Sequence, residues 1–298
     1  MSARPVAVLV ALALGLGAIL AACGSDGDGN SSSTAATATK AGSSDSKRAA
    51  VVWAIGDGAD GGGAARRVAE MVARAKPDRM LYLGDVYDSG TREEYENNYR
   101  PAYGRFDSIA APTPGNHDWH NRAEGYDPYW KAAGLVTNRH YYSFRTAGWE
   151  IISLNSESGL EDGSPQRRWL KQRLRRPGTC RIAFWHRPFQ NAGRHGNQED
   201  TGALWRALRG RATLVLNGHD HNFQHFKRRD GIVQLISGAG GHGLYKSDQH
   251  DPRLVWDEDD EFGALRLNLR PGAARFSFVT LPGRTLHSGS ARCRRATG

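Results

Sequence analysis

The chain has 298 residues, of which 39% are hydrophobic, and it carries 40 Lys and Arg against 31 Asp and Glu, a formal net charge of +9. After the N-terminal region it is long enough for one domain with a substantial core, and it has no second apolar run of membrane-spanning length. A basic surface suits phosphate-bearing substrates. The basic residues are scattered along the chain, however, which gives no support for a dedicated nucleic-acid partner.

The N-terminus has the features of an export signal. Arg4 gives it a positive start, and Val6 to Ile19 is apolar but short for a bilayer span. The following Leu20-Ala21-Ala22-Cys23 resembles the lipobox of bacterial lipoproteins. That resemblance implies a signal peptide over 1–22 and a lipid anchor on Cys23, whereas the alternative is an ordinary secretory signal with an incidental cysteine.

The segment after the signal differs sharply in composition from the rest of the chain. Residues 23–48 are rich in Ser, Gly, Asp, Thr and Ala and offer almost nothing to bury, which predicts a flexible tether. The globular domain would then cover 49–298. These features predict an exported protein, anchored by lipid to the outer face of a bacterial cell membrane.

Strands and helices alternate through the first part of this domain. Helices are indicated by apolar residues three and four apart, as at Val68, Met71 and Val72, or by an N-cap before proline, as at Ser164-Pro165. Strands are predicted at 50–55, 80–83, 149–154, 181–185 and 213–216, and helices at 64–75, 93–105 and 164–174. From residue 222 the pattern changes to β-hairpins, with strands at 232–236, 264–269 and 274–279. The sequence therefore predicts an α/β fold with a mostly β tail.

Two cysteines remain if Cys23 is lipidated. Cys180 and Cys293 are far apart in the sequence, and in an oxidising compartment they could pair and tie the C-terminal segment to the start of a strand. Two buried thiols are the alternative, and the sequence does not distinguish the two states.

Short polar clusters follow the predicted strands. Taken singly, a Gly-Asp pair after a strand is usually a tight turn with a side-chain hydrogen bond. Together the clusters supply carboxylate, amide and imidazole groups, which are the ligands that hold two borderline metal ions side by side. The clusters are Gly56-Asp57, Gly84-Asp85, Gly115-Asn116-His117-Asp118, His186 and Gly218-His219-Asp220-His221. Their joint occurrence predicts a dinuclear metal centre.

The order of these clusters resembles that of the calcineurin-like metallophosphoesterase superfamily, and within it the purple-acid-phosphatase-like branch. The similarity covers about residues 50–245. It extends to the motifs Gln166-Arg167-Arg168-Trp169-Leu170, Trp185-His186-Arg187-Pro188, His195-Gly196 and Gly218-His219-Asp220-His221-Asn222-Phe223. The resemblance implies a four-layer α/β/β/α sandwich in which two mixed β-sheets pack together and the metal ions lie at one sheet edge.

The resemblance also implies a set of metal ligands and a mechanism. The first ion would be held by Asp57, Asp85 and His221, and the second by Asp85, Asn116, His186 and His219. The ions would be divalent or trivalent Fe, Mn or Zn, and Asp85 would bridge them. Their residual charge would bind a phosphate and convert a water to hydroxide, which would attack phosphorus in line. His117 would act as the acid that protonates the leaving oxygen.

Two positions depart from the family pattern. Ala59 stands where many members have a histidine two residues after the first aspartate. Purple acid phosphatases have a tyrosine three residues after the bridging aspartate. In this chain that position is Asp88, and Tyr87 stands one residue before it. The run Gly84-Asp85-Val86-Tyr87-Asp88-Ser89-Gly90 instead resembles the serine/threonine phosphatase pattern, in which the second aspartate orients the histidine of the motif. This resemblance implies that Asp88 orients His117 rather than binding metal, although Asp88 or Tyr87 as a ligand stays open.

Two residues outside the ligand set are candidates for substrate contacts. His195 lies in a loop that resembles a substrate-contacting loop of the family, and it would bind phosphate or act as an auxiliary acid. Arg187 could clamp a phosphate oxygen, although an arginine after a strand more often faces solvent. His225 and His242 are interpreted as structural or surface residues.

The sequence thus predicts a metal-dependent phosphoric ester hydrolase, an acid-phosphatase-like phosphomonoesterase that acts on a small-molecule phosphoester at the outer cell surface. A phosphodiesterase or nuclease with the same metal centre is one alternative, because only the shape of the pocket separates the two activities. A non-enzymatic lipoprotein that binds metal or phosphate is another, and the presence of His117 argues against it. The metal pair, the physiological substrate and the oligomeric state stay open.

Overall fold

The computed structural model describes residues 48–135 and 139–293. The predicted signal peptide, Cys23 and the predicted tether up to residue 47 lie outside the described residues. Within the described ranges, no helix combines the length and the apolar character needed to cross a membrane.

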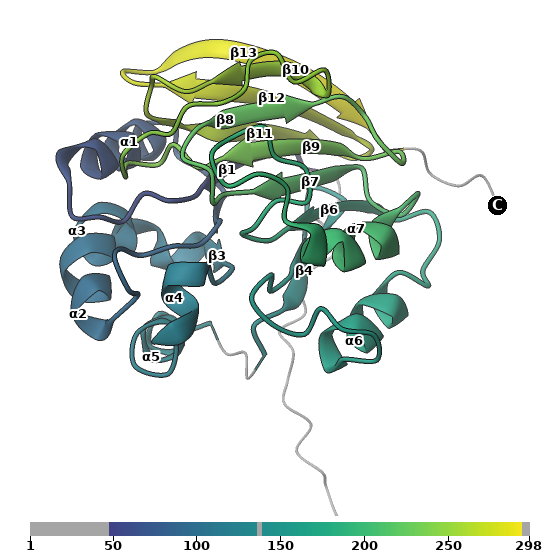
Figure 1. Cartoon of the computed structure of the whole chain (residues 1–298), viewed down its shortest axis with the longest axis horizontal. Helices are drawn as coiled ribbons and strands as arrows, with labels where there is room; N and C mark the ends of the chain where they lie inside the picture. Colours follow the sequence, from purple (N-terminus) through teal and green to yellow (C-terminus); the bar gives the residue numbers. More distant parts are fainter. Residues whose placement is uncertain (1–47, 136–138, 294–298) are drawn as a thin grey trace, which may run out of the picture. The chain divides into compact units, whose positions relative to one another are not determined.

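One mixed sheet brings together the first strands and the last strands of the domain (Figure 1). Its six strands lie in the order β13-β12-β11-β1-β2-β3, with β1 parallel to β2 and antiparallel to β11. β1 can lie inside the sheet because its apolar side chains are nearly all buried. The strands are β1 (Ala50–Ile55), β2 (Arg79–Tyr82), β3 (Ala110–Pro112), β11 (Gly263–Arg270), β12 (Ala273–Thr280) and β13 (Arg284–Arg292).

The second sheet is also mixed, and its seven strands lie in the order β10-β8-β9-β7-β6-β5-β4. The parallel neighbours β5, β6, β7 and β9 are buried along their whole length, as expected for strands covered on both faces. The strands are β4 (Tyr142–Thr146), β5 (Trp149–Ser153), β6 (Cys180–Phe184), β7 (Leu214–Asn217), β8 (Phe223–Phe226), β9 (Val233–Ser237) and β10 (Leu254–Glu258).

Helices cover the outer face of each sheet. Val68 and Val72 of α1 pack with Trp53 in the outer cluster of the six-stranded sheet, and Leu170 of α6 packs with Trp205 of α7 outside the seven-stranded sheet. The helices on the first sheet are α1 (Gly63–Arg74), α2 (Arg92–Glu94), η1 (Tyr95–Tyr99), α3 (Arg100–Tyr103), η2 (Gly104–Ile109), α4 (Asn116–His120) and α5 (Tyr126–Ala132). Those on the second are α6 (Pro165–Arg173), η3 (Glu199–Thr201) and α7 (Gly202–Leu208).

The inner faces of the two sheets share one apolar core. Val52 and Leu81 of the first sheet belong to the same buried cluster as Ile151, Ile182 and Leu214 of the second. Apolar clusters therefore lie between the sheets and on both outer faces. This is a four-layer α/β/β/α sandwich with two mixed sheets, and the predicted fold is confirmed.

Most of the predicted elements match the structure to within one or two residues. The predicted helix at 93–105 is a continuous run of α2, η1 and α3, which the structure extends into η2. The sequence pattern missed β13, because its residues Arg-Thr-Leu-His-Ser-Gly-Ser-Ala-Arg are mostly polar or small. Such a composition is compatible with an edge strand that pairs on one side only, as β13 does with β12.

Cys180 and Cys293 form a disulfide, which resolves the alternative that the sequence left open. The bond joins the first residue of β6 to the residue that follows β13, with a Cα–Cα distance of 5.4 Å and a sequence separation of 113. It therefore ties the edge strand of one sheet to an interior strand of the other.

Candidate metal centre

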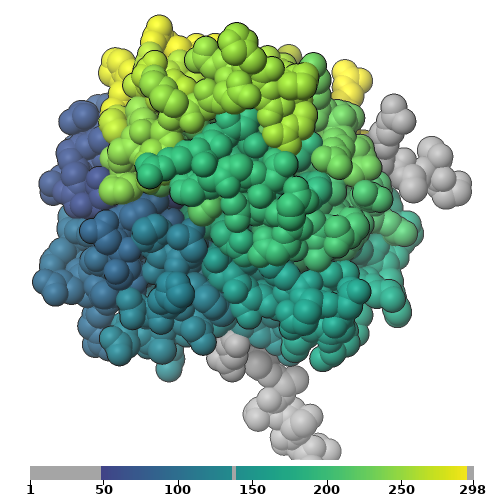
Figure 2. All heavy atoms as spheres, in the orientation of Figure 1, coloured from purple at the N-terminus to yellow at the C-terminus, as the bar shows by residue number. Residues whose placement is uncertain are grey.

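The polar clusters meet where parallel strands of both sheets end. Backbone hydrogen bonds connect these ends directly: Gly56 N donates to Ser237 O at 2.9 Å, and Asp57 N donates to Gly84 O at 3.1 Å. Blue and green parts of the chain, far apart in the sequence, meet in the middle of the face shown in Figure 2. Convergence at the carboxyl ends of parallel strands is the usual place for a site in an α/β fold.

Left-handed backbone turns aim three of the side chains inward. Asp57, Asp85 and His219 have φ values of 59°, 69° and 77°. Non-glycine residues rarely adopt such values, and they cluster at functional sites where the surrounding structure holds them. Gly115 allows close approach, since a Cβ on it would lie 1.9 Å from Asp85 Oδ1.

One group of donor atoms surrounds the hydroxyl of Tyr87. Tyr87 Oη lies 3.0 Å from Asp57 Oδ1, 3.2 Å from Asp85 Oδ2 and 2.8 Å from His221 Nε2. These three partners are the residues predicted to hold the first ion. The expectation that Tyr87 stands one residue too early to join them is not supported by this geometry.

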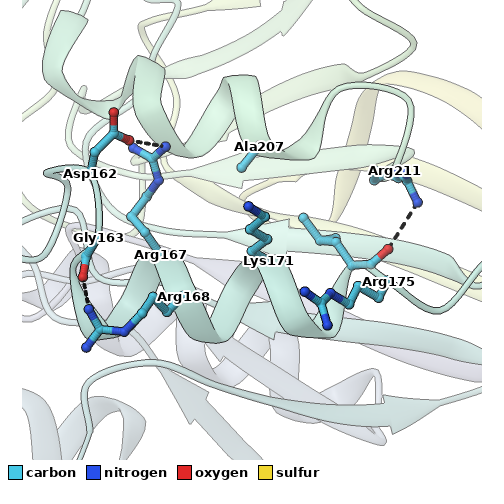
Figure 3. Close-up of a pocket in the computed structure, with 9 residues that line it drawn as sticks. Asp162, Gly163, Arg167, Arg168, Lys171, Arg175, Ala207 and Arg211 are labelled. Atoms are coloured by element: carbon cyan, nitrogen blue, oxygen red, sulfur yellow. Dashed lines mark hydrogen bonds and ion pairs between the residues drawn. The ribbon is translucent and has the colours of Figure 1, made fainter.

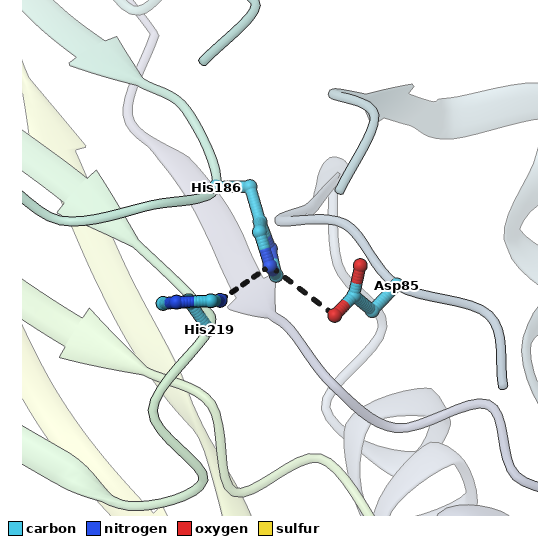
Figure 4. Close-up of side chains that lie close together, drawn as sticks. All are labelled: Asp85, His186 and His219. Carbon is cyan, nitrogen blue, oxygen red and sulfur yellow. Dashed lines mark hydrogen bonds and ion pairs between the residues drawn. The ribbon is translucent and has the colours of Figure 1, made fainter. Parts of the chain in front are cut away.

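A second group surrounds His186 Nε2 (Figure 4). This atom lies 3.0 Å from Asn116 Oδ1, 3.2 Å from Asp85 Oδ2 and 3.2 Å from His219 Nδ1. These are the four residues predicted to hold the second ion. Asp85 Oδ2 belongs to both groups, so Asp85 has the position that a bridging ligand requires.

Burial and mutual proximity shift the pKa values of these groups. Burial raises the pKa of Asp57 well above its ordinary range, and Asp85 adds to the rise against the opposing effect of His186. The pKa of Asp85 is lowered despite its burial, chiefly by His186. Burial acts against protonated His186 as well, but Asp85 raises its pKa to about 10. Burial and His186 together lower the pKa of His219 to about 2.

These residues fit a pair of cations. The two aspartates and three histidines are at most 8% exposed, and their donor atoms point at one another. Asp85, His186 and His219 can each offer one ligand atom within 4.8 Å of the others. Two buried carboxylates this close require positive charge nearby, and mixed oxygen and nitrogen donors suit Fe, Mn or Zn.

Backbone carbonyls orient the histidine rings. His186 Nδ1 lies 2.8 Å from Leu83 O, and His221 Nδ1 lies 2.6 Å from Gly243 O. Because a carbonyl oxygen only accepts hydrogen bonds, Nδ1 of each neutral ring carries the proton and donates the hydrogen bond. The lone pair of Nε2 is then available to bind a cation.

Asp118 connects two of the site loops, a role that sequence reasoning did not assign. Its fully buried carboxylate accepts hydrogen bonds from Asp85 N at 2.9 Å, Gly115 N at 2.8 Å and Tyr95 Oη at 2.8 Å. Burial and the Asp85 charge raise the pKa of Asp118 to about 7. Its place beside Asn116 and His117 in the Gly-Asn-His-Asp cluster was the only sequence signal.

His117 is held by the backbone oxygen of Asp88 and not by its carboxylate. Its Nδ1 lies 2.5 Å from the backbone oxygen of Asp88, whereas the exposed carboxylate of Asp88 makes no such contact. His117 Nε2 lies 4.0 Å from Asp85 Oδ2, and the side chain is 37% exposed. The ring thus borders the ligand group and is open to solvent on the other side.

His195 lies against the second ligand group. Its ring centroid is 4.2 Å from that of His219, and its Nδ1 is 3.7 Å from Asp220 Oδ1. Asp220 is fully buried and accepts hydrogen bonds from Arg194 N at 3.1 Å and His195 N at 3.3 Å. This carboxylate, whose role could not be predicted from the sequence, therefore fixes the loop that carries His195.

Arg187, predicted as a possible phosphate clamp, has its guanidinium paired within the chain. Its guanidinium donates to Glu157 at 3.1 Å, to Gln198 at 3.0 Å, to Asp200 at 2.6 Å and to the backbone oxygen of Ser156 at 2.5 Å. These contacts occupy the donors of the side chain. The acidic partners come from separate loops, which the sequence could not bring together.

Two aromatic contacts at the site were also not predicted. His242 stacks on Tyr87 with ring centroids 3.9 Å apart, and its Nδ1 lies 3.2 Å from Asp60 Oδ2. Tyr245 stacks on His221, also with centroids 3.9 Å apart. The sequence predicts a structural or surface position for His242, and the structure places its ring against a site residue. His225, by contrast, pairs with His287 at 2.9 Å between strands β8 and β13.

The model of the calcineurin-like phosphoesterase family matches residues 41–223, more than half of the chain. The chain belongs to this family. The curated relatives it matches are purple acid phosphatases. It is 27% identical over 210 residues to a probable purple acid phosphatase of Arabidopsis thaliana, with 58% of this chain and 47% of the relative covered. It is 26% identical over 192 residues to a purple acid phosphatase of Ipomoea batatas, with 55% and 40% covered. The chain thus spans about half the length of the curated relatives it matches.

Solved structures show the same phosphoesterase fold. A purple acid phosphatase from yellow lupin (Lupinus luteus) seeds has a TM-score of 0.65 and 13% identity, with 82% of this chain and 54% of that chain covered. A dimetal phosphatase from Danio rerio has a TM-score of 0.58 and 14% identity, with 81% and 98% covered. At these low sequence identities, the similarity shows a shared fold alone and carries no conclusion about activity.

Proposed function

We propose that the protein is a phosphomonoesterase with a dinuclear metal centre. The proposal rests on one observation: the six predicted ligands, from loops throughout the domain, form two adjoining groups that share Asp85 Oδ2. Membership in the phosphoesterase family supports it. Tyr87 joins the first ligand group in this account, because its hydroxyl lies among the three other members.

The pair of ions, when bound, would supply Lewis-acid activation of water and neutralise phosphate charge. The protein contributes orientation and charge. Asp57 and Asp85 are buried and offset part of the positive charge, and Asp85 Oδ1 is kept in place by the backbone N–H of His117 at 3.0 Å. The fixed, buried donors need no reorganisation during the reaction, which is the main way in which such sites lower a barrier.

His117 is the proposed general acid. Its Nδ1 faces the backbone oxygen of Asp88, so Nδ1 carries a proton and the imidazolium has its second proton on Nε2. Nε2 is the atom that borders the ligand group, 4.0 Å from Asp85 Oδ2. A leaving oxygen at the open side of the site would take its proton there. His195, held by Asp220 against His219, is the proposed second contact for phosphate.

The substitution His117→Ala tests this assignment. We expect kcat for a chromogenic phosphomonoester to fall about 10²- to 10⁴-fold, the usual worth of general acid catalysis, with unchanged metal content. His120→Ala is the matched control, because His120 is exposed on the same helix α4. Turnover by His117→Ala at the wild-type rate would remove the acid from the account. Faster turnover of a diester than of a monoester would instead assign a phosphodiesterase.

We also propose that Cys23 carries a lipid anchor at the outer face of the cell membrane. The support is the short apolar segment that leads into Leu20-Ala21-Ala22-Cys23, followed by the Ser- and Gly-rich tether. In this account the catalytic domain acts on phosphoesters outside the cell.

A further inference from the structure

Two cavities share a lining residue near the start of β7. The first, of ≈ 570 Å³, lies between α6 and α7 (Figure 3). The second, of ≈ 1050 Å³, lies beside the start of β6 and the end of β13. Arg211 lines both cavities, and we take the two together as one hollow. We call this hollow the basic groove and define it by Lys171, Arg175, Arg176, Arg211, Arg228 and Arg292.

The cations of the basic groove lack acidic partners among the described residues. Arg211 and Arg228 each donate only to a backbone oxygen, that of Leu174 at 3.1 Å and that of Gly231 at 2.7 Å. The side chains of the other four make no hydrogen bond or ion pair within the described part of the chain. Figure 3 shows Lys171 between Arg167 on one side and Arg175 and Arg211 on the other.

Acidic groups contribute little to the lining. Of the described residues that line the two cavities, Asp162 is the single acid, and it pairs with Arg167 at 2.8 Å. The groove therefore keeps at least six uncompensated positive charges. Charges gathered this way raise the local concentration of anions, and the guanidinium fork matches phosphate oxygens two at a time.

The shape and lining of the groove restrict the kind of anion. Gly178, Gly210 and Gly231 line the second cavity and leave it open, because they have no side chains. A concave path of this kind suits a linear chain better than a flat lipid surface. No aromatic side chain lines either cavity within the described residues, so the stacking platforms that bind nucleobases are missing.

The groove is separate from the candidate metal centre. Cys180, which opens β6, lies beside it, whereas His186 follows the other end of the same strand. Six residues of extended chain span about 20 Å, so the two places lie at opposite ends of the strand.

We propose that the basic groove binds a linear phosphate polymer without bases, inorganic polyphosphate. Successive phosphates lie along the groove and contact Arg175, Arg176 and Arg211 in turn. The site holds the polymer and performs no chemistry on it. The proposal does not depend on the proposed catalytic activity.

Binding of fluorescently labelled inorganic polyphosphate to the purified full chain tests the proposal, with a variant that removes two groove cations. Arg175→Gln/Arg176→Gln should weaken binding about tenfold, and added salt should weaken the wild type more steeply than the variant. Arg67→Gln/Arg74→Gln is the matched control, because it removes the same charge from exposed positions on α1. The control should bind within about twofold of the wild type. Hydrolysis of a small monoester should be unchanged in both variants, which separates a failure of the groove from a failure of the proposed function.

Three results would overturn the proposal. The first is a wild type that does not bind polyphosphate. The second is an equal loss of binding in both double variants, which would indicate that the polymer is attracted by the overall positive charge and not by the groove. The third is tighter binding of a single-stranded oligonucleotide or of anionic phospholipid vesicles than of polyphosphate, lost in Arg175→Gln/Arg176→Gln. That outcome would assign the groove to another class of partner.

Discussion

At the scale of single residues, the packing of the turn that carries Tyr87 places its side chain among the proposed metal ligands. Its backbone N–H donates to Ala59 O at 2.9 Å, and Ala59 stands where many family members have a histidine. The small side chain of Ala59 is fully buried beside this turn. Burial and the Asp57 charge raise the pKa of Tyr87 well above its ordinary value, so a phenolate at this position requires a cation.

Tyr87→Phe tests whether this hydroxyl binds metal. Iron-loaded wild-type protein should have a visible absorption band from a tyrosinate–iron pair, and the variant should lose the band. Tyr82→Phe is the control, because the buried Tyr82 hydroxyl donates to Asp85 O at 2.7 Å but does not contact the ligand atoms. An iron-loaded wild type without a band, or a Tyr87→Phe variant that keeps it, would exclude Tyr87 as an iron ligand.

At the scale of elements, β6 is held by polar as well as apolar contacts. Glu150 of β5 is 1% exposed and accepts from Arg181 Nε of β6 at 2.8 Å and from Arg173 Nε of α6 at 2.9 Å. The Cys180–Cys293 disulfide secures the start of the same strand. Because His186 follows β6, these contacts at one end of the strand help to position a ligand at the other.

Glu150→Ala should lower the free energy of unfolding by about 3–5 kcal/mol, because it leaves the buried Arg181 charge without its carboxylate partner, with only backbone oxygens to accept from it. Denaturant unfolding checks this value. Glu70→Ala, an exposed acid on α1, should change it by less than about 0.5 kcal/mol. A loss below about 1 kcal/mol in Glu150→Ala would show that water or a rearranged partner compensates the arginine.

At the scale of the whole molecule, the proposed anchor sets where the catalytic domain acts. Cys23→Ala should move the protein from the membrane fraction to the soluble exported fraction, because the lipid would be its only hold on the membrane. Cell fractionation with an antibody to the domain measures this directly. A Cys23→Ser variant should behave in the same way. If both variants stay in the membrane fraction, a lipid on this cysteine is not the anchor.

Much of the fold and six of the proposed ligands could be predicted from the sequence. Ligands such as Asp57 and His186 follow buried strands, and strand ends are local features of the sequence. What could not be predicted depends on long-range contacts. Arg187 is paired by acids from other loops, and the basic residues, scattered in sequence, gather into the basic groove only when α6, α7 and β13 come together.

The central claim is that two cations share Asp85, and the metal content of Asp85→Ala tests it most directly. Elemental analysis of the wild-type chain should give two metal ions per chain, and Asp85→Ala should hold almost none, because both ligand groups lose the shared oxygen. One ion or none in the wild type, or an Asp85→Ala variant that keeps both ions, would contradict the account.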